Sequence, residues 1–147
     1  MEASTRYNVL HAPHHQSVLD FAVDENRFAP LTIENALDTE KNDVCLSFAN
    51  RQWLENQNLV FVDDYYMNGY GIERLIQTIL VIEGTNPFSD GIEYASEASA
   101  CHVHFVDVDL AIRTAKLAAK MLNSPAILKK VIEVARETIK VTRERIW

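Results

Sequence analysis

The side chains in this chain that are suited to acid–base or metal chemistry are carboxylates and imidazoles placed near short extended runs. Six of them lie in the middle of the chain: Asp63, Asp64, Glu93, Glu97, His102 and His104. Gathered in one groove, such groups could catalyse hydrolysis by acid–base transfer or with a bound metal. However, the chain has no nucleophile with a base at motif spacing and no glycine-rich phosphate loop. A small hydrolase or metal-dependent enzyme is therefore the alternative prediction, and a protein with no catalysis of its own is the leading one.

The histidines form two sets, and neither makes a complete metal site. His11, His14 and His15 lie beside a proline in a stretch without periodicity, whereas metal ligands need fixed geometry and a matching set. His102 and His104 share one face of an extended run, but no acid or cysteine joins them on that face. We therefore predict no tightly bound metal and no cofactor.

A more distinctive cluster, residues 63–66, places two carboxylates directly before two tyrosines. Tyrosine is enriched in protein interfaces, and exposed carboxylates attract a basic surface. We therefore predict a partner-binding surface made of this cluster, a nearby tyrosine and two glutamates of a later hairpin. Its residues are Asp63, Asp64, Tyr65, Tyr66, Tyr70, Glu93 and Glu97.

The cluster lies inside the stretch around which the chain is organised, residues 58–84. Apolar residues 59–62 predict a buried strand. An amphipathic helix follows, with one apolar stripe: Ile72, Leu75, Ile76, Ile79 and Leu80. Between strand and helix, Asn68, Gly69 and Gly71 supply backbone freedom. They predict a tight strand-to-helix connection, and this scaffold role is compatible with binding.

The segments around this stretch predict antiparallel strands. Strands are expected at residues 17–23, 28–33, 43–49, 91–96 and 100–106. The first two of these strands are expected to form one hairpin, and the last two another. Residues 34–42 and 51–57 are expected to be connections. Trp53, in the second connection, either fills the core or is an exposed anchor, and its large apolar area favours the core.

Two helices close the chain. Asp107 or Asp109 caps the first, whose apolar stripe lies opposite its basic residues. Ser124 and Pro125 begin the second, which is expected to end near Arg145. The whole pattern predicts an α+β fold, with an antiparallel sheet of about five to six strands packed against about three helices, two of them C-terminal.

Composition fits one soluble domain. The chain has 147 residues, 48% of them hydrophobic, which predicts a single domain over residues 1–147 with residues 1–16 as a loosely held arm or an edge segment. Cys45 and Cys101 each lie in an apolar run and are expected to be free thiols in a reducing compartment. The start of the chain lacks the pattern of a signal peptide, and no apolar run could span a bilayer. We therefore expect a cytoplasmic protein without a membrane role.

The net charge of −7 is unevenly distributed. Residues 1–109 hold 18 acidic side chains against 5 basic ones, whereas residues 110–147 hold 3 acidic against 9 basic. The acidic part disfavours direct nucleic-acid binding and favours a basic protein partner, although an acidic balance can also serve solubility alone. The basic face of the last helix lacks the interleaved aromatic residues of a nucleic-acid surface.

Three stretches carry a resemblance to a known family. They are Asn68-Gly69-Tyr70 leading into Ile72-Glu73-Arg74-Leu75, then Ile92 to Ala98 with its central Glu-Tyr-Ala-Ser-Glu, then Leu110 to Leu122 with Ser124-Pro125 behind it. From residue 59 onward the chain resembles the immunity protein 51 family of bacterial polymorphic-toxin and contact-dependent growth inhibition systems. It departs from that pattern at Gly71-Ile72, where an acidic or aromatic pair is expected, and its first 50 residues take no part.

The resemblance implies a single immunity-type domain that binds and neutralises the C-terminal domain of a cognate bacterial toxin. The toxin is expected to be secreted or contact-delivered, and to be a basic nuclease. The immunity protein is expected to be cytoplasmic, to make no direct contact with nucleic acid or membrane, and to be a monomer or weak dimer when free. A homo-oligomeric adaptor built on the C-terminal helices is a third alternative.

Overall fold

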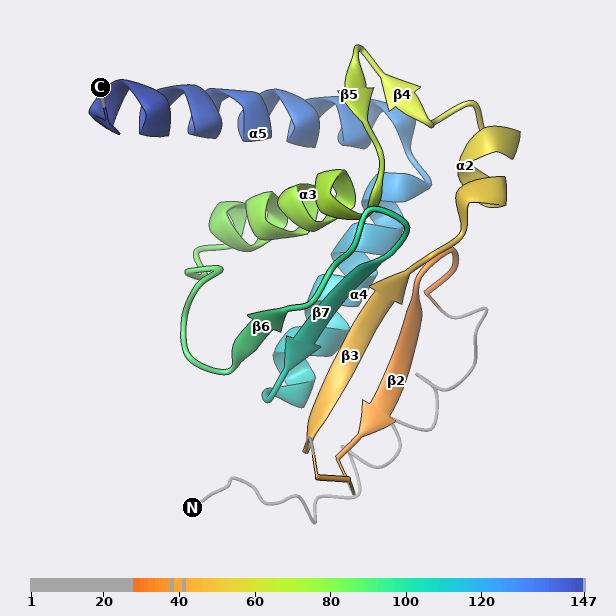
Figure 1. Ribbon diagram of the computed structural model, residues 1–147, viewed down its shortest axis with the longest axis vertical. Coiled ribbons are helices and arrows are strands. Elements are labelled where there is room, and N and C mark those ends of the chain that lie inside the picture. The colour runs from red at the N-terminus through yellow and green to blue at the C-terminus, as the bar shows by residue number, and fades with distance from the viewer. Residues whose placement is uncertain (1–27, 38, 41, 147) are drawn as a thin grey trace.

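The computed structural model describes residues 28–37, 39–40 and 42–146, with side chains described up to residue 138. It has the predicted α+β fold (Figure 1). The main sheet is antiparallel with strand order β2-β3-β7-β6, and a separate two-stranded sheet pairs β4 with β5. The strands are β2 (Thr32–Ala36), β3 (Asp43–Phe48), β4 (Phe61–Val62), β5 (Tyr65–Tyr66), β6 (Ile92–Tyr94) and β7 (Cys101–Phe105). The helices are α2 (Arg51–Asn56), α3 (Gly69–Ile82), α4 (Val108–Leu122) and α5 (Pro125–Ile146).

β3 and β7 form the centre of the main sheet because apolar residues alternate along both strands. Val44 of β3 lies opposite Phe105 of β7, and Leu46 lies opposite Val103. All four side chains are completely buried. The predicted strand at residues 43–49 and the hairpin of residues 91–96 with 100–106 are thus confirmed, the hairpin as β6 and β7.

The helices cover one face of the main sheet. In Figure 1, α4 lies behind the main sheet, α3 lies to its left, and α5 extends above α3 from the upper end of α4. α4 packs on β3 and β7, α3 packs on β7, and α5 packs on α3 and α4. The predicted apolar stripe of α3 is buried throughout. Asp107, rather than Asp109, caps α4, with its carboxylate accepting the Leu110 N–H at 3.1 Å.

The predicted strand at residues 59–62 is wrong in length and position. Only Phe61 and Val62 are extended, and they pair with Tyr66 and Tyr65 outside the main sheet. Residues 59–60 form a half-buried connection that packs against the core. A short apolar run does not by itself distinguish a strand from a connection that lies on the core.

Two segments predicted to be connections contain regular structure. Residues 34–36 belong to β2, because they pair with residues 43–45 of β3. Residues 51–56 form α2, which begins where the Asn50 side chain accepts the Trp53 N–H at 3.0 Å. The Trp53 ring meets Phe48 edge-on at 6.2 Å and is half-buried, so this tryptophan packs on the core as predicted.

The predicted number of elements is approximate. The described residues form six strands split between two sheets, rather than one sheet of five to six strands, and four helices rather than about three. The strand predicted at residues 28–33 is correct only for Thr32 and Ile33, because residues 28–31 form a turn closed by the Leu31 N–H donating to the Phe28 carbonyl at 2.8 Å. The arm predicted at residues 1–16 and the strand predicted at residues 17–23 lie outside the described residues. None of the described helices is both long and apolar enough to cross a membrane.

Candidate functional site

The β4–β5 hairpin carries four of the predicted partner-binding residues. Its two-residue turn, Asp63 and Asp64, has positive φ at both positions, 50° and 69°. Such a turn matches the twist of the flanking strands, and aspartate is one of the few residues that tolerates this left-handed conformation. The turn therefore holds both exposed carboxylates at the tip of the hairpin.

The two faces of the hairpin have different roles. On the outer face, Phe61 is 62% exposed and Tyr66 is 43% exposed, and their rings stack with centroids 4.8 Å apart. On the inner face Val62 is buried, and the half-buried Tyr65 hydroxyl donates to the Gly71 carbonyl at 2.6 Å. Burial raises the pKa of the Tyr65 phenol to about 12, so this hydroxyl keeps its proton at physiological pH. The inner face anchors the hairpin and leaves the aromatic pair in solvent.

Two arginines hold the hairpin from its sides. Arg136 of α5 donates a hydrogen bond to the Asp63 carbonyl oxygen. Arg51 of α2 lies beside the Tyr66 side chain. A hydrogen bond with Tyr66 is the main cause of a raised pKa of the Arg51 guanidinium, and a hydrogen bond with Glu55 is the second. A hollow of about 270 Å³ lies below, between α2, the hairpin and the turn that joins β6 to β7.

The turn that opens α3 explains the glycines next to the hairpin. The Asn68 side chain caps the helix by accepting the Gly71 N–H at 2.8 Å. Gly69 donates its N–H to the Ala98 carbonyl at 2.9 Å, and a Cβ at this position would lie 1.8 Å from the Glu97 carbonyl oxygen. The predicted tight connection is thus found, and it also joins α3 to the β6–β7 turn.

A second group of polar side chains lies on the face of the main sheet that α3 and α4 leave uncovered. Cys45 of β3, His104 of β7 and Glu93 of β6 are aligned across three strands. The Cys45 sulfur lies 3.7 Å from His104 Nε2. One pair further along, the Ser47 hydroxyl lies 2.8 Å from His102 Nδ1.

Asp43 completes a thiol–imidazole–carboxylate series. Its Oδ2 lies 3.3 Å from His104 Nδ1, close enough for an ion pair when the imidazole is protonated. The geometry of this contact is not that of a hydrogen bond. Asp43 Oδ1 and His104 Nδ1 are both buried, and neither atom has a hydrogen-bond partner in the described part of the chain.

The order thiol, imidazole, carboxylate is that of a nucleophile, its base and the group that orients the base. In this protein, however, Cys45 is only 6% exposed and does not line the neighbouring groove. A substrate in the groove would meet His104 and not the thiol. The second cysteine, Cys101, is buried in the core, where burial raises its pKa to about 12. Cys45 and Cys101 do not form a disulfide, in agreement with the prediction.

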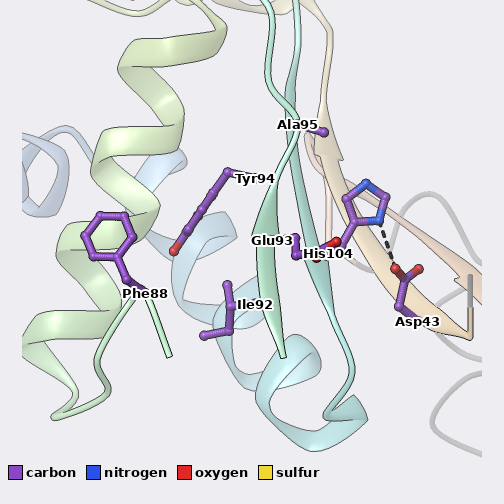
Figure 2. A pocket seen from close by; sticks show the side chains of 7 residues that line it. All are labelled: Asp43, Phe88, Ile92, Glu93, Tyr94, Ala95 and His104. Carbon is purple, nitrogen blue, oxygen red and sulfur yellow. Dashed lines mark ion pairs between the residues drawn. The ribbon is translucent and has the colours of Figure 1, made fainter. Parts of the chain in front are cut away.

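The groove itself, shown in Figure 2, follows the edge of β6 and has a volume of about 590 Å³. Figure 2 shows Glu93 and His104 on one side of β6, and Tyr94, Ile92 and Phe88 on the other. The Tyr94 hydroxyl donates to the Pro87 carbonyl at 2.6 Å, which fixes its ring. Phe88 is 71% exposed and meets the Tyr94 ring edge-on.

The structure divides the predicted site residues between these places. Asp63, Asp64, Tyr65 and Tyr66 form the hairpin, and the half-buried Tyr65 also anchors it through its hydroxyl. Tyr70, 55% exposed, stands in the first turn of α3, and Glu97 is exposed in the β6–β7 turn that packs against that helix. Glu93 lies on the groove. The described residues contain no group of three or more histidine, cysteine, aspartate or glutamate side chains that could hold a metal ion.

Sequence reasoning missed four residues that matter here: Asp43, Arg51, Phe61 and Phe88. For Phe61 a signal existed, because two turn-forming aspartates between apolar and aromatic pairs are typical of a two-residue hairpin. For the other three we find no sequence signal, since their positions depend on how distant segments pack. Comparisons of the chain with protein-family models, with curated proteins and with solved structures find no match.

Proposed function

We propose that this protein is a cytoplasmic, immunity-type binding module that neutralises a basic bacterial toxin domain, and that its β4–β5 hairpin contacts the toxin. The observation that carries the proposal is the exposed Phe61–Tyr66 stack next to the two tip carboxylates. Aromatic residues are enriched in protein interfaces, and tyrosine is enriched among the residues that contribute most of the binding energy. The resemblance to immunity proteins, stated above, names the class of partner.

The hairpin is suited to this role because it is already rigid. The Tyr65 hydroxyl, Arg136 and the left-handed turn fix its backbone before any partner arrives. Binding then needs little ordering of the chain, which leaves more of the contact energy as affinity. The carboxylates of Asp63 and Asp64 add long-range attraction for a basic surface, which raises the association rate.

An enzymatic function has weaker support. The acid–base alternative needs Asp63, Asp64, Glu93 and the strand histidines in one groove, but the aspartates lie on the hairpin and do not line the groove at Glu93 and His104. We therefore propose a protein without catalysis, metal or cofactor, which binds neither nucleic acid nor membrane directly and is a monomer or weak dimer when free.

The test is binding to the toxin domain encoded next to this chain's gene, together with protection of growth when the two are expressed together. Phe61→Ala and Tyr66→Ala should each lower affinity by about 2 kcal/mol or more, about thirtyfold in Kd. Ile82→Ala is the matched control, because Ile82 is a large apolar residue that is 52% exposed on the far end of α3.

The charge contribution is tested with Asp63→Asn and Asp64→Asn together. Asparagine tolerates positive φ as aspartate does, so it removes the charges and keeps the turn, whereas lysine would strain it. The double variant should associate more slowly and lose most of the wild-type salt dependence. Full affinity in the hairpin variants would move the interface elsewhere, and absence of both binding and protection in the wild type would reject the function.

A further inference from the structure

β6 is an edge strand of the main sheet in the part of the chain that the structure describes. Its Glu93 lies opposite His104 of β7, the Ala95 N–H donates to the His102 carbonyl and the Gly91 carbonyl accepts from Val106. Backbone groups alternate in direction along an antiparallel strand, so those of Ile92 and Tyr94 point away from β7. The Ile92 N–H donates to the Ser89 carbonyl in a local turn. The N–H and carbonyl of Tyr94 point from the edge of β6 toward the groove.

The lining of the groove along this edge is suited to one extended chain. A strand added to β6 would lie about 4.8 Å from it, inside the cavity described above. Next to it, on the side of the helices, the exposed Phe88 ring and the Tyr94 ring form an apolar wall. On the opposite side lies the exposed carboxylate of Glu93.

The charges around the edge are acidic. None of the seven residues that line the groove is a lysine or an arginine, and two are acids. The pKa of the Tyr94 phenol is raised mainly by burial and secondly by the negative charge of Glu73 of α3. Glu73 therefore lies close to the helix side of this edge. This acidic surrounding favours an occupant that carries a basic side chain next to Glu93.

We propose that a segment of the basic protein partner adds to β6 as a further strand, with a lysine or arginine opposite Glu93 and apolar side chains against Phe88 and Tyr94. This inference rests on the proposed function and names the chemistry of a second contact. A second copy of this chain is disfavoured, because pairing two β6 edges in antiparallel register brings Glu93 next to its own copy, and like charges directly opposite destabilise a sheet. β6 also carries no lysine or proline, residues that commonly protect an edge from pairing.

The first experiment uses a synthetic probe, an acetylated and amidated heptapeptide of alternating valine and lysine. We expect it to bind the full chain, with slowed hydrogen exchange at the Tyr94 amide, because that N–H becomes paired with the added strand. The same peptide with alternate backbone nitrogens methylated keeps its charge and should give no protection. No binding at millimolar peptide, or binding that leaves the Tyr94 amide exchange unchanged, would overturn the proposal.

The charge reversal Glu93→Lys separates contact from net charge. It should weaken peptide binding about tenfold or more, the order of effect seen for close interfacial charges. Glu133→Lys on the exposed face of α5 makes the same change in net charge and should have little effect. Hydrogen exchange of the β3 and β7 amides in the free Glu93→Lys variant shows whether the sheet is intact. Equal weakening by both variants would reduce the effect to general electrostatics and overturn the proposal.

Binding of the toxin domain to these variants separates failure of the strand addition from failure of the proposed function. Glu93→Lys should weaken toxin binding about tenfold, in addition to the loss from the hairpin variants. Toxin binding that depends on Phe61 and not on Glu93 would refute the strand addition and leave the function standing. A toxin domain that does not bind the wild type at all would refute the function, whereas the peptide result would still report on the β6 edge.

Discussion

Replacing Gly69 with alanine tests the junction on which both candidate surfaces depend. An added Cβ would lie 1.8 Å from the Glu97 carbonyl oxygen and 2.6 Å from that of Ala100. Both atoms belong to the backbone, so the β6–β7 turn itself must move. Overpacking of this kind costs about 1–3 kcal/mol, and losing the Gly69 N–H bond to Ala98 adds about 1 kcal/mol. Against this, alanine in place of a helical glycine gains about 0.5–1 kcal/mol.

The net expectation is a destabilisation of about 2 kcal/mol, measured as the free energy of unfolding in urea. Gly84→Asn is the matched control: Gly84 has a φ of 85° and nothing within 4 Å of an added Cβ, and asparagine tolerates that conformation. It should change stability by less than about 1 kcal/mol. A Gly69→Ala protein as stable as wild type, or more stable, would refute the close approach of α3 to the β6–β7 turn.

Two further expectations concern the core and the hairpin anchor. Ile76→Ala should lower the free energy of unfolding by about 2–5 kcal/mol because Ile76 is completely buried, whereas Gln77→Ala on the half-buried side of α3 should be nearly neutral. Urea unfolding measures both variants, and a larger loss for Gln77→Ala would mean that the assigned buried face of α3 is wrong. The unfolded chain loses the Tyr65 proton near the ordinary phenol pKa of 10.0, whereas burial in the folded protein raises this pKa to about 12. The stability due to this group is therefore complete below pH 10 and falls between pH 10 and about 12. Denaturation at stepped pH should show a smaller fall for Tyr65→Phe and an unchanged fall for the exposed Tyr70→Phe.

The sequence was most informative where one local rule decided the outcome. Alternation along residues 43–49 and 100–106 predicts which side chains enter the core, because only one face of the sheet is covered by helices. The cap at Asp107, one of the two predicted candidates, depends only on a neighbour three residues away. Elements of this kind are recognisable from a single sequence because their cause lies within them.

Prediction was weakest where structure depends on distant partners. Residues 34–36 carry little strand signal and become β2 only because β3 lies beside them. The acidic cluster was recognised, but its hairpin turn was not, and neither was the anchoring bond from the Tyr65 hydroxyl to the Gly71 carbonyl. The meeting of Asp43 with His104 joins residues 61 positions apart, and no local pattern reports such a meeting.

The first turn of α3 fixes two loops at once, since Gly71 accepts from Tyr65 of one hairpin and Gly69 donates to Ala98 of the other. An inserted residue between these glycines would rotate one bond relative to the other by about 100°, the angle that one residue subtends in an α-helix. Both bonds could not then form together. Side chains around this turn can change during evolution, but its length cannot. Homologous chains that differ widely in their surface residues should therefore show neither insertions nor deletions between positions 68 and 72.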